Sequence, residues 1–576
     1  MRRSEKGRVF QFCKIVYSNL ITPGVLRQIY SVSIYRAYLT ALLVSAGLAG
    51  CAAGPDFKRP PAPSSSGYAP ASGVPETTAS APVFAGESQR FNPRADIPFD
   101  WWELFQSPQL NSLIKRAFEA NPNIESAQAA LHQAQEYAIA QKGFFYPTVG
   151  ASYSASRNKL AGNMTSSDPG IQGNGQLIQA PAGAASPVYY NFHVAQLTVG
   201  YTPDVFGLNR RQAESAQAQA DAQKFLLEAT YITLASNVVA AAIQEASLRA
   251  QLAATEVIVD SNRKTLDILR NQLKLGYVSG MEVAAQESAL ANTEQSAIPL
   301  RRQLEQTRDL IRALAGNLPN EDVEEKFELA SLHLPKELPL SLPSKIVEQR
   351  PDVRAAEEQL HFASAQAGVA IANTLPQFTV AGAVGGMAST PGWMFRSGGG
   401  FFDLTADVAY TIFDGGTLRA KSRAAQQALI QAGAQYRGTV ITALQNVADT
   451  LHVIQSDADA LKAADTSERA AQTAATITRR QYEVGYVNDQ TVLAAEQSHQ
   501  LAMINLIQAQ TNRLGDTAAL YQALGGGWWN RPDAMAKQDI KSAAAESHAL
   551  APGEPVKLTY ASAPLLRFSL PSVRSC

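Results

Sequence analysis

The segments Leu269–Ser288 (LRNQLKLGYVSGMEVAAQES) and Thr478–Gln497 (TRRQYEVGYVNDQTVLAAEQ) decide the fold, because each interrupts a helical pattern with the same glycine-centred turn. The matching triplets are Gly276-Tyr277-Val278 and Gly485-Tyr486-Val487, at an offset of 485 − 276 = 209. Glycine readily adopts the left-handed backbone conformation that ends a helix. The sequence therefore predicts one helical hairpin built twice.

The similarity between the two copies extends well beyond the turns. NPNIESAQAALHQA from Asn121 resembles RPDVRAAEEQLHFA from Arg350, and the offset of 209 continues to Gly316 and Gly525. The larger offset at the start, 351 − 122 = 229, requires a loop about twenty residues longer in the first copy, and the Gly-, Asn- and Ser-rich residues 160–187 supply it. Such a tandem pattern predicts one supersecondary unit used twice.

Each copy reads helix, strand, loop, strand, long helix, turn, helix. The predicted domains are a first structural repeat at 99–316, an equatorial inter-repeat segment at 317–341 and a second structural repeat at 342–530. Before them lie a signal peptide at 1–50 and a linker at 51–98, and after them a tail at 531–576 without a core pattern, which we expect to be disordered.

The strands show a period of two residues, which is typical of a sheet with two different faces. In the last strand one face carries Phe402, Leu404, Ala406, Val408, Tyr410 and Ile412, and the other carries Asp403, Thr405, Asp407 and Thr411. Near Val149, apolar and polar residues alternate in the same way, while the strands near Leu197 and Phe378 alternate less cleanly. The apolar face indicates lipid, and the polar face with Asp403 and Asp407 indicates a water-filled lumen.

Four strands cannot close a barrel, because about eight are needed. Left open, the sheet would expose its edges. Copies of the chain are therefore expected to assemble around an axis, giving eight strands from two chains or twelve from three. These patterns alone leave both numbers open.

The long helices set the dimensions. Arg210 to Gly276 and Arg419 to Gly485 are both 66 residues apart, so each helix would extend roughly 100 Å. The flanking helices, expected within 121–146 and 282–314, are on the order of half that length. Two of them stacked end to end would match one long helix. The strands would then lie at one end of the molecule and the glycine turns at the other, with the helix breaks near Gly316 and Gly525 halfway along its length.

The N-terminus predicts export and acylation. Basic residues precede the apolar segment YLTALLVSAGLAG, which ends at Cys51. Leu48-Ala49-Gly50-Cys51 resembles a lipobox, in which the cysteine of a bacterial lipoprotein is acylated, and an ordinary signal peptide is the alternative. Ala52 rather than Asp after this cysteine implies sorting to the outer membrane, by resemblance to bacterial lipoproteins.

Several function classes are disfavoured. The net charge of −1 gives no basic footprint for nucleic acid. The three widely spaced cysteines favour neither a disulfide framework nor a thiolate metal site. His132 and His361 occupy equivalent repeat positions without further ligands at a metal spacing, so we interpret them as repeat remnants on a packed helix face. We therefore expect no enzyme activity, no metal and no cofactor.

Four segments carry a family resemblance: CAAGPDFKRP at Cys51, WWELFQSPQLNSLIKRAFEANPNI at Trp101, the doubled GYV turns and YQALGGGWWN at Tyr521. From roughly Cys51 to Asn530 the chain resembles the TolC-like outer-membrane efflux proteins, and most closely their OprM/NodT-type lipoprotein branch. The resemblance implies an α+β membrane protein: a homotrimer with a twelve-stranded β-barrel, a long α-helical coiled-coil barrel in the periplasm and an equatorial domain.

The same resemblance implies function and partners. The chain would be the exit duct of a tripartite efflux pump, passively exporting small molecules such as drugs or toxic compounds. Its partners would be a periplasmic adaptor, an inner-membrane transporter of the resistance-nodulation-division class and outer-membrane lipid. Two alternatives remain open: the exit duct of a protein secretion system, and a coiled-coil periplasmic lipoprotein without a channel. The alternating strands argue against the second, since a bridging lipoprotein does not need them.

Site residues follow from the resemblance, position by position. The two GYV turns would be the hairpin tips on which the adaptor docks, although as structure alone they only permit a tight helix reversal. Acidic residues just after the tips line a gated mouth in relatives, and Glu282 occupies that position here. The second copy has Thr491 and Ala494 where relatives often have Asp, and its nearest acid is Glu496. The further gate candidates are Asp489, Arg479 and Arg480, for which the alternative is a solvated tip.

Overall fold

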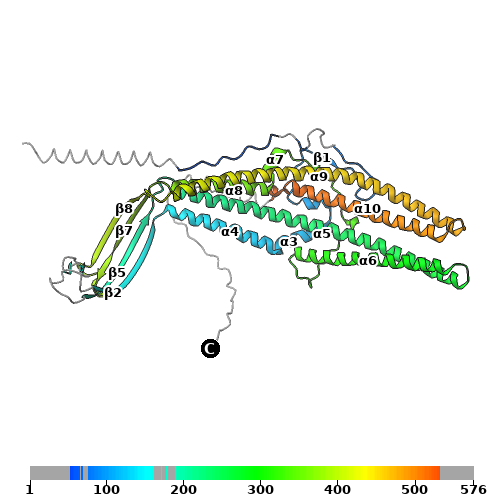
Figure 1. The fold of residues 1–576 in the computed structure, drawn as a ribbon, viewed down its shortest axis with the longest axis horizontal. Helices are drawn as coiled ribbons and strands as arrows, with labels where there is room; N and C mark the ends of the chain where they lie inside the picture. Colours follow the sequence, from blue (N-terminus) through cyan, green and yellow to red (C-terminus); the bar gives the residue numbers. More distant parts are fainter. Residues whose placement is uncertain are drawn as a thin grey trace, which may run out of the picture.

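The structure is a computed structural model that describes residues 52–64, 67–68, 76–160, 170–171, 177–178 and 188–531. A sheet lies at one end of an elongated molecule, and two helical hairpins end at the other (Figure 1). The signal peptide, Cys51 and the tail beyond Arg531 lie outside the described residues.

The sheet is antiparallel, in the order β2-β5-β7-β8. Its strands are β2 (Thr148–Leu160), β5 (Val188–Tyr201), β7 (Gln377–Ala388) and β8 (Gly400–Ala409). The short strands β3 (Gly170–Ile171) and β4 (Leu177–Ile178) pair within the loop between β2 and β5. Each copy of the repeat contributes two neighbouring strands, as predicted from the sequence.

The register brings the apolar residues of all four strands onto one face. Val149 pairs with Val199, Val199 with Gly382, and Gly382 with Leu404, so these positions share a side of the sheet. The large side chains on this face are bare: Phe402 is 85% exposed and Leu404 76%. Asp403 pairs with Ala383 and Asp407 with Thr379, which places both carboxylates on the opposite face. The weak alternation of the two central strands therefore still belongs to a two-faced sheet.

Two helices of 67 residues each run along the molecule, α5 (Leu208–Lys274) and α9 (Thr417–Glu483). The shorter helices are α4 (Pro122–Lys142), α6 (Gly280–Leu314), α8 (Pro351–Ala372) and α10 (Asp489–Ala523). Among the helices in the described residues, α5 alone is apolar enough to cross a membrane, with a mean hydropathy of 1.5 over 18 residues, but 61% of that window is buried. Burial within the bundle accounts for its apolar character.

Along α9, apolar residues recur every three or four residues, a spacing typical of coiled-coil packing, and most of them form a buried seam. Val440, Val447, Leu451 and Ile454 are buried, as the spacing predicts. Leu444, however, is only partly buried, and Ala443 takes its place in the core.

The short helices meet end to end, as the sequence predicts, and both copies use the same joint. The Asn121 Nδ2 group donates to the Leu314 carbonyl at 2.9 Å, and the Arg350 Nη1 group donates to the Ala523 carbonyl at 3.0 Å. These bonds satisfy carbonyls that a helix end leaves without partners. Asn121 and Arg350 each directly precede the proline that begins their helix. Through these bonds α4 continues the line of α6, and α8 continues the line of α10.

A middle layer lies against the bundle near the level of these joints (Figure 1). It contains β1 (Arg90–Asn92) paired in parallel with β6 (Glu337–Pro339), the 3-10 helix η1 (Trp101–Phe105), α3 (Pro108–Ala120) and α7 (Pro343–Gln349). Trp101 is fully buried and stacks on Tyr521 with ring centroids 5.3 Å apart. The end of the predicted linker is therefore not a spacer: β1 joins the inter-repeat segment, and Phe91 and Ile97 are buried in the core.

Candidate docking, anchoring and channel sites

The two hairpin tips have the same backbone hydrogen bonds. The Gly276 N–H donates to the Leu273 carbonyl at 3.0 Å, and the Tyr277 N–H donates to the Gln272 carbonyl at 2.9 Å. The second tip repeats both bonds from Gly485 and Tyr486. Gly276 and Gly485 have φ of +79° and +80°, so each tip is a Schellman turn that needs its glycine.

Within each GYV triplet the three residues do different things. The glycine allows the reversal, and the space beside it is open to solvent. Val278 packs inward against the small cluster of Leu266, Leu269 and Val283. The tyrosine points away from the hairpin, since Tyr277 is 78% exposed and Tyr486 83%. Within the triplet, the tyrosine ring is therefore the side chain most open to solvent.

An ion pair joins the two helices of each hairpin at the same height. The Arg270 guanidinium lies 2.8 Å from the Glu287 carboxylate, and Arg479 pairs with Glu496 at the positions one repeat later, 270 + 209 and 287 + 209. Arg479, a gate candidate, is thus committed to its own hairpin. The repeated Arg–Glu spacing was visible in the sequence and could have predicted this pair.

The other gate candidates differ in how they are held. The Glu282 carboxylate accepts a hydrogen bond of 2.6 Å from the Ser279 N–H, which completes a capping box at the start of α6. Asp489 is the first residue of α10, and Arg480 is exposed in the last turn of α9. The assignment of these residues to a gate stays a prediction.

The two tips differ in their packing. The leucines at 266 and 269, buried in the first hairpin, are replaced at the equivalent positions by Ala475 and Thr478. Where the first hairpin has Leu290, the second has His499, whose Nε2 lies 3.0 Å from a Glu468 carboxylate oxygen. The second tip therefore has less apolar area to hold its helices together.

The N-terminal segment is bound to the bundle where the sheet meets the helices. The Ala53 N–H donates to the Phe206 carbonyl at 2.9 Å, and Arg211 reaches Asp56 at 2.7 Å. A Cβ on Gly207 would lie 2.7 Å from the Ala52 Cα atom, so the segment lies directly on this glycine. The residue after the predicted acylation site is thereby fixed just below the end of β5.

His361 helps to hold this segment, unlike its repeat equivalent. Its ring stacks on Phe57 with centroids 4.3 Å apart, and its nitrogens lie 2.9 Å from Glu214 and 3.3 Å from Glu358. Hydrogen bonds to Glu358 and Glu214 raise the pKa of His361 above its ordinary value of 6.5 despite partial burial. The packed-face interpretation is therefore right for His361 and wrong for His132, which is exposed.

We expect attachment of the N-terminal segment to weaken as the pH rises. A raised pKa means that the stabilisation is fully present below 6.5 and is lost as the pH passes the pKa of the folded state. Hydrogen exchange at the Ala53 amide, corrected for intrinsic rates, should show less frequent opening at pH 5.5 than at pH 8.5. The variant His361→Phe keeps a ring against Phe57 and should lose this dependence, while His132→Phe should keep it. An unchanged pH profile in His361→Phe would refute the assignment.

Two buried arginines attach the middle layer to the last helix of each copy. Arg308 donates to the Val323 carbonyl at 2.8 Å and to the Glu325 carbonyl at 3.1 Å, and so holds the inter-repeat segment. Arg513, 1% exposed, donates to Thr78 Oγ1 at 3.0 Å and to the Glu87 carbonyl, and so holds the N-terminal segment. The sequence analysis does not identify these two arginines. The available signal was a single arginine within the apolar stripe of a helix.

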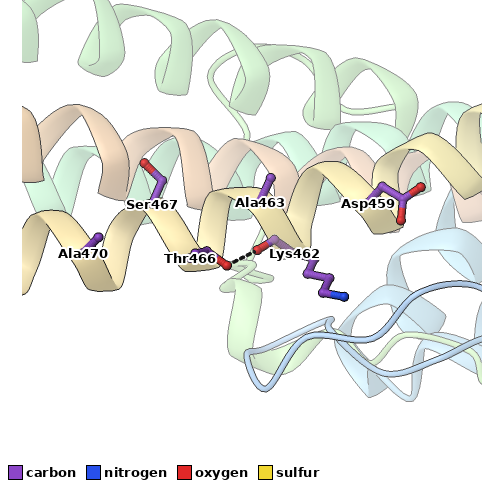
Figure 2. Close-up of a pocket in the computed structure, with 6 residues that line it drawn as sticks. All are labelled: Asp459, Lys462, Ala463, Thr466, Ser467 and Ala470. Atoms are coloured by element: carbon purple, nitrogen blue, oxygen red, sulfur yellow. Dashed lines mark hydrogen bonds between the residues drawn. The ribbon is translucent and has the colours of Figure 1, made fainter.

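No site for chemistry is evident in the part of the chain that the structure describes. A hollow of about 540 Å³ lies on the outside of α9 and is lined only by that helix (Figure 2). Its residues are Asp459, Lys462, Ala463, Thr466, Ser467 and Ala470. Among the described residues, no three His, Cys, Asp or Glu side chains lie close enough to hold a metal ion. The hollow is a groove along a helix rather than a pocket with convergent groups.

Comparison with known proteins agrees with this geometry. The family model for outer membrane efflux proteins matches residues 113–317 and 342–526. The pyoverdine export outer membrane protein OpmQ of Pseudomonas putida is 28% identical over 471 residues, covering 81% of this chain and 94% of OpmQ. The toluene efflux pump outer membrane protein TtgC, also of Pseudomonas putida, is 26% identical, covering 86% of this chain and 96% of TtgC.

Among solved structures, the CmeC outer membrane channel of Campylobacter jejuni matches with a TM-score of 0.72 and 20% identity, covering 85% of this chain and 98% of CmeC. The predicted TolC-like fold is confirmed, and the family is one of channel-forming proteins rather than enzymes. The chain belongs to the outer membrane efflux protein family, and it is an efflux channel of the outer membrane that extends into the periplasm.

Proposed function

We propose that three copies of the chain form a closed duct through the outer membrane and across much of the periplasm. The observation that carries this proposal is the sheet: its four strands have one bare apolar face, and its outer strands β2 and β8 each have one edge without a partner among the described residues. Eight strands leave an interior that side chains fill, whereas larger barrels enclose a channel. Three chains give twelve strands, with Asp403 and Asp407 facing the lumen.

The long helices continue this duct below the membrane. In each chain α5 and α9 have equal lengths, and the joined pairs α4–α6 and α8–α10 run beside them. Much of the outward surface of α9 is small or polar and exposed, including the groove lined by Asp459 and Ala463. We assign this groove to contact with a helix of the neighbouring copy, since one helix alone cannot fill it.

Cys51 anchors the chain through its acyl groups. Ala52, the residue after Cys51, is bound beside Gly207 just after the end of β5, and this contact supports an anchor at the membrane-facing sheet. The bonds from Arg211 to the Ala53 carbonyl and Asp56 hold the segment there. The anchor therefore enters the periplasmic leaflet at the base of the barrel.

The hairpin tips receive the periplasmic adaptor. Tyr277 and Tyr486 are the exposed rings of two turns with matching backbone geometry, so six equivalent tips would surround the mouth of a trimer. The gate lies in the same region, around Glu282, Asp489, Arg479 and Arg480. Because the Arg270–Glu287 and Arg479–Glu496 pairs fix each hairpin internally, we expect the mouth to open by movement of whole hairpins.

The exported compounds are small molecules delivered by an inner-membrane transporter of the resistance-nodulation-division class. The relatives' names include a pyoverdine export protein and a toluene efflux protein, so the family serves chemically different compounds. We assign to this chain the class of small toxic compounds, with the choice among them made by the transporter.

Single-particle electron microscopy of the lipidated, detergent-purified chain tests the duct. We expect a hollow particle with three-fold symmetry and a length well over roughly 100 Å, as a helix of 67 residues plus a membrane barrel requires. A two-fold or solid particle would contradict the proposal.

Docking is tested separately by placing a photo-crosslinking amino acid at Tyr277 in living cells. We expect adducts with a periplasmic protein rich in helical hairpins. The matched control is the same residue at Ile268, which is 57% exposed but about two turns back from the tip. Equal yields at both positions, or adducts only between copies of this chain, would refute docking at the tip.

A further inference from the structure

The outward face of the sheet ends in a cluster of cations and aromatic rings, at the end away from the helices. Arg157 pairs with Asn191 and Lys159 with Tyr189, in phase with Val149 and therefore on the apolar face. Both cations are exposed, and the Lys159 Nζ atom lies 5.5 Å from the centre of the Tyr189 ring. The apolar face thus changes into a charged rim within its last few residues.

The β7–β8 loop adds to the same face by folding back over it. A Cβ on Gly386 would lie 2.3 Å from the Met394 carbonyl oxygen and 3.2 Å from the Phe395 ring, and Gly386 is in phase with Val384 on the apolar side. Met394 is buried beneath the loop at 2% exposure. The loop therefore lies outside the barrel wall and not in the lumen.

This fold-back leaves two rings and one cation directed outward. Trp393 is 56% exposed and Phe395 77%. The Arg396 guanidinium carbon lies 5.9 Å from the centre of the Trp393 ring, which holds the cation beside the exposed indole. We call the set Arg157, Lys159, Tyr189, Trp393, Phe395 and Arg396 the outer rim.

Among the described residues of the strands that carry it, the outer rim has cations but no acids. The described residues 148–160, 188–201 and 377–402 contain no Asp or Glu, so the three rim cations have no acidic neighbour within these strands. The acids of the neighbouring strand β8, Asp403 and Asp407, lie on the opposite face. Uncompensated cations with long stems beside apolar rings are suited to the level of lipid head groups, where the stem contacts acyl chains and the charge contacts phosphate.

We propose that the outer rim binds the anionic, phosphate-bearing head groups of the glycolipid in the outer leaflet. Its position supports this occupant: the helices lie in the periplasm, so this end of the sheet lies at the opposite surface of the outer membrane. The rim is also continuous with the lipid-facing band of Phe402 and Leu404. The inference depends on the membrane location and not on which compounds are exported.

The test measures binding of lipid A, with and without its phosphate groups, to the full-length chain in nanodiscs of zwitterionic lipid. The wild type should bind the phosphorylated form far more tightly than the dephosphorylated one. The variant Arg157→Gln/Lys159→Gln/Arg396→Gln should lose on the order of 100-fold in affinity for the phosphorylated form, since each surface cation contributes about fivefold. Its affinity for the dephosphorylated lipid should not change.

The matched control is Arg263→Gln/Lys264→Gln/Arg301→Gln, which removes the same number of exposed cations from the periplasmic helices. This variant should bind lipid A like the wild type. A loss of less than about tenfold in the rim variant, an equal loss in the control, or equal binding of both lipid forms by the wild type would overturn the proposal. Size-exclusion chromatography shows whether each variant still assembles, and a failed assembly is replaced by the single variant Arg396→Gln, expected to lose about fivefold.

Discussion

Replacing Gly525 by alanine should destabilise the chain by about 2–5 kcal/mol, because two costs add at this residue. Gly525 has φ of +99°, where a side chain costs about 1–2 kcal/mol. The new Cβ would also lie 2.5 Å from the Gln349 carbonyl oxygen, and overpacking of this kind costs about 1–3 kcal/mol. The contact is with backbone at the joint between α10 and α8, so it cannot be relieved by turning a side chain.

The tips provide the control for this prediction. Gly485 has a similar φ of +80°, but nothing lies within 4 Å of its would-be Cβ. Gly485→Ala should therefore cost only the strain of about 1–2 kcal/mol. Gly316→Ala, whose Cβ would lie 2.6 Å from the Ala120 carbonyl oxygen, should resemble Gly525→Ala. Thermal unfolding of the purified variants checks the order, and a Gly485 variant as unstable as the Gly525 variant would show that crowding at the joint contributes nothing.

The overall architecture could be predicted because residue spacings that repeat along the sequence indicate it. The offset of 209 between Gly276 and Gly485 fixed the equal hairpins, and it also relates the ends of α5 and α9 and of α6 and α10. The alternation around Phe402 revealed a two-faced sheet. Each of these features repeats a local pattern over many residues, so a few atypical positions do not hide it.

The middle layer could not be predicted in the same way. Strands β1 and β6 have three residues each, and they pair across a separation of 337 − 90 = 247 residues. Such short strands carry no periodicity, and their conformation depends on the surface they meet. The Pro- and Ser-rich composition before residue 98 indicated a linker, although its end is fixed by Arg513 and by the buried ring of Phe91.

The site residues also fall into two groups: those marked by a local sequence pattern, and those brought together only by the fold. The positions of Tyr277 and Tyr486 followed from the turns, and the Ser279–Glu282 capping box was present in the sequence as a Ser and a Glu three residues apart. That signal indicated a helix that begins just after Ser279, and it gave Glu282 a structural role in the helix cap whether or not it also lines a gate. The outer rim was not found, because Arg157 and Arg396 lie far apart in the chain and share one face of the sheet only through the strand register and the fold-back of the β7–β8 loop.

The second large effect is expected at Arg308. Its side chain is 6% exposed and lies 3.0 Å from the Glu245 carboxylate, which is fully buried. Arg308→Thr leaves that carboxylate with Arg249 as its remaining cation and removes the donor to the Val323 and Glu325 carbonyls. Breaking a buried pair in this way costs up to about 3–5 kcal/mol, because the Glu245 charge stays fully buried with only the more exposed Arg249 beside it. Removing Arg301, part of a pair that is 62% and 50% exposed, should cost at most about 1 kcal/mol.

The second copy of the repeat shows how the loss at Arg308 can be repaired. At the positions equivalent to Glu245 and Arg308 it has Ile454 and Thr517, both buried, so the fold accepts an uncharged pair at this height. The double variant Glu245→Ile/Arg308→Thr should therefore recover most of the stability lost in Arg308→Thr, because no charge is left buried. Thermal unfolding of the two variants decides the matter. If the double variant is no more stable than the single one, the main contribution of Arg308 lies in its bonds to the inter-repeat carbonyls, and the ion pair with Glu245 serves only to keep the guanidinium in place for them.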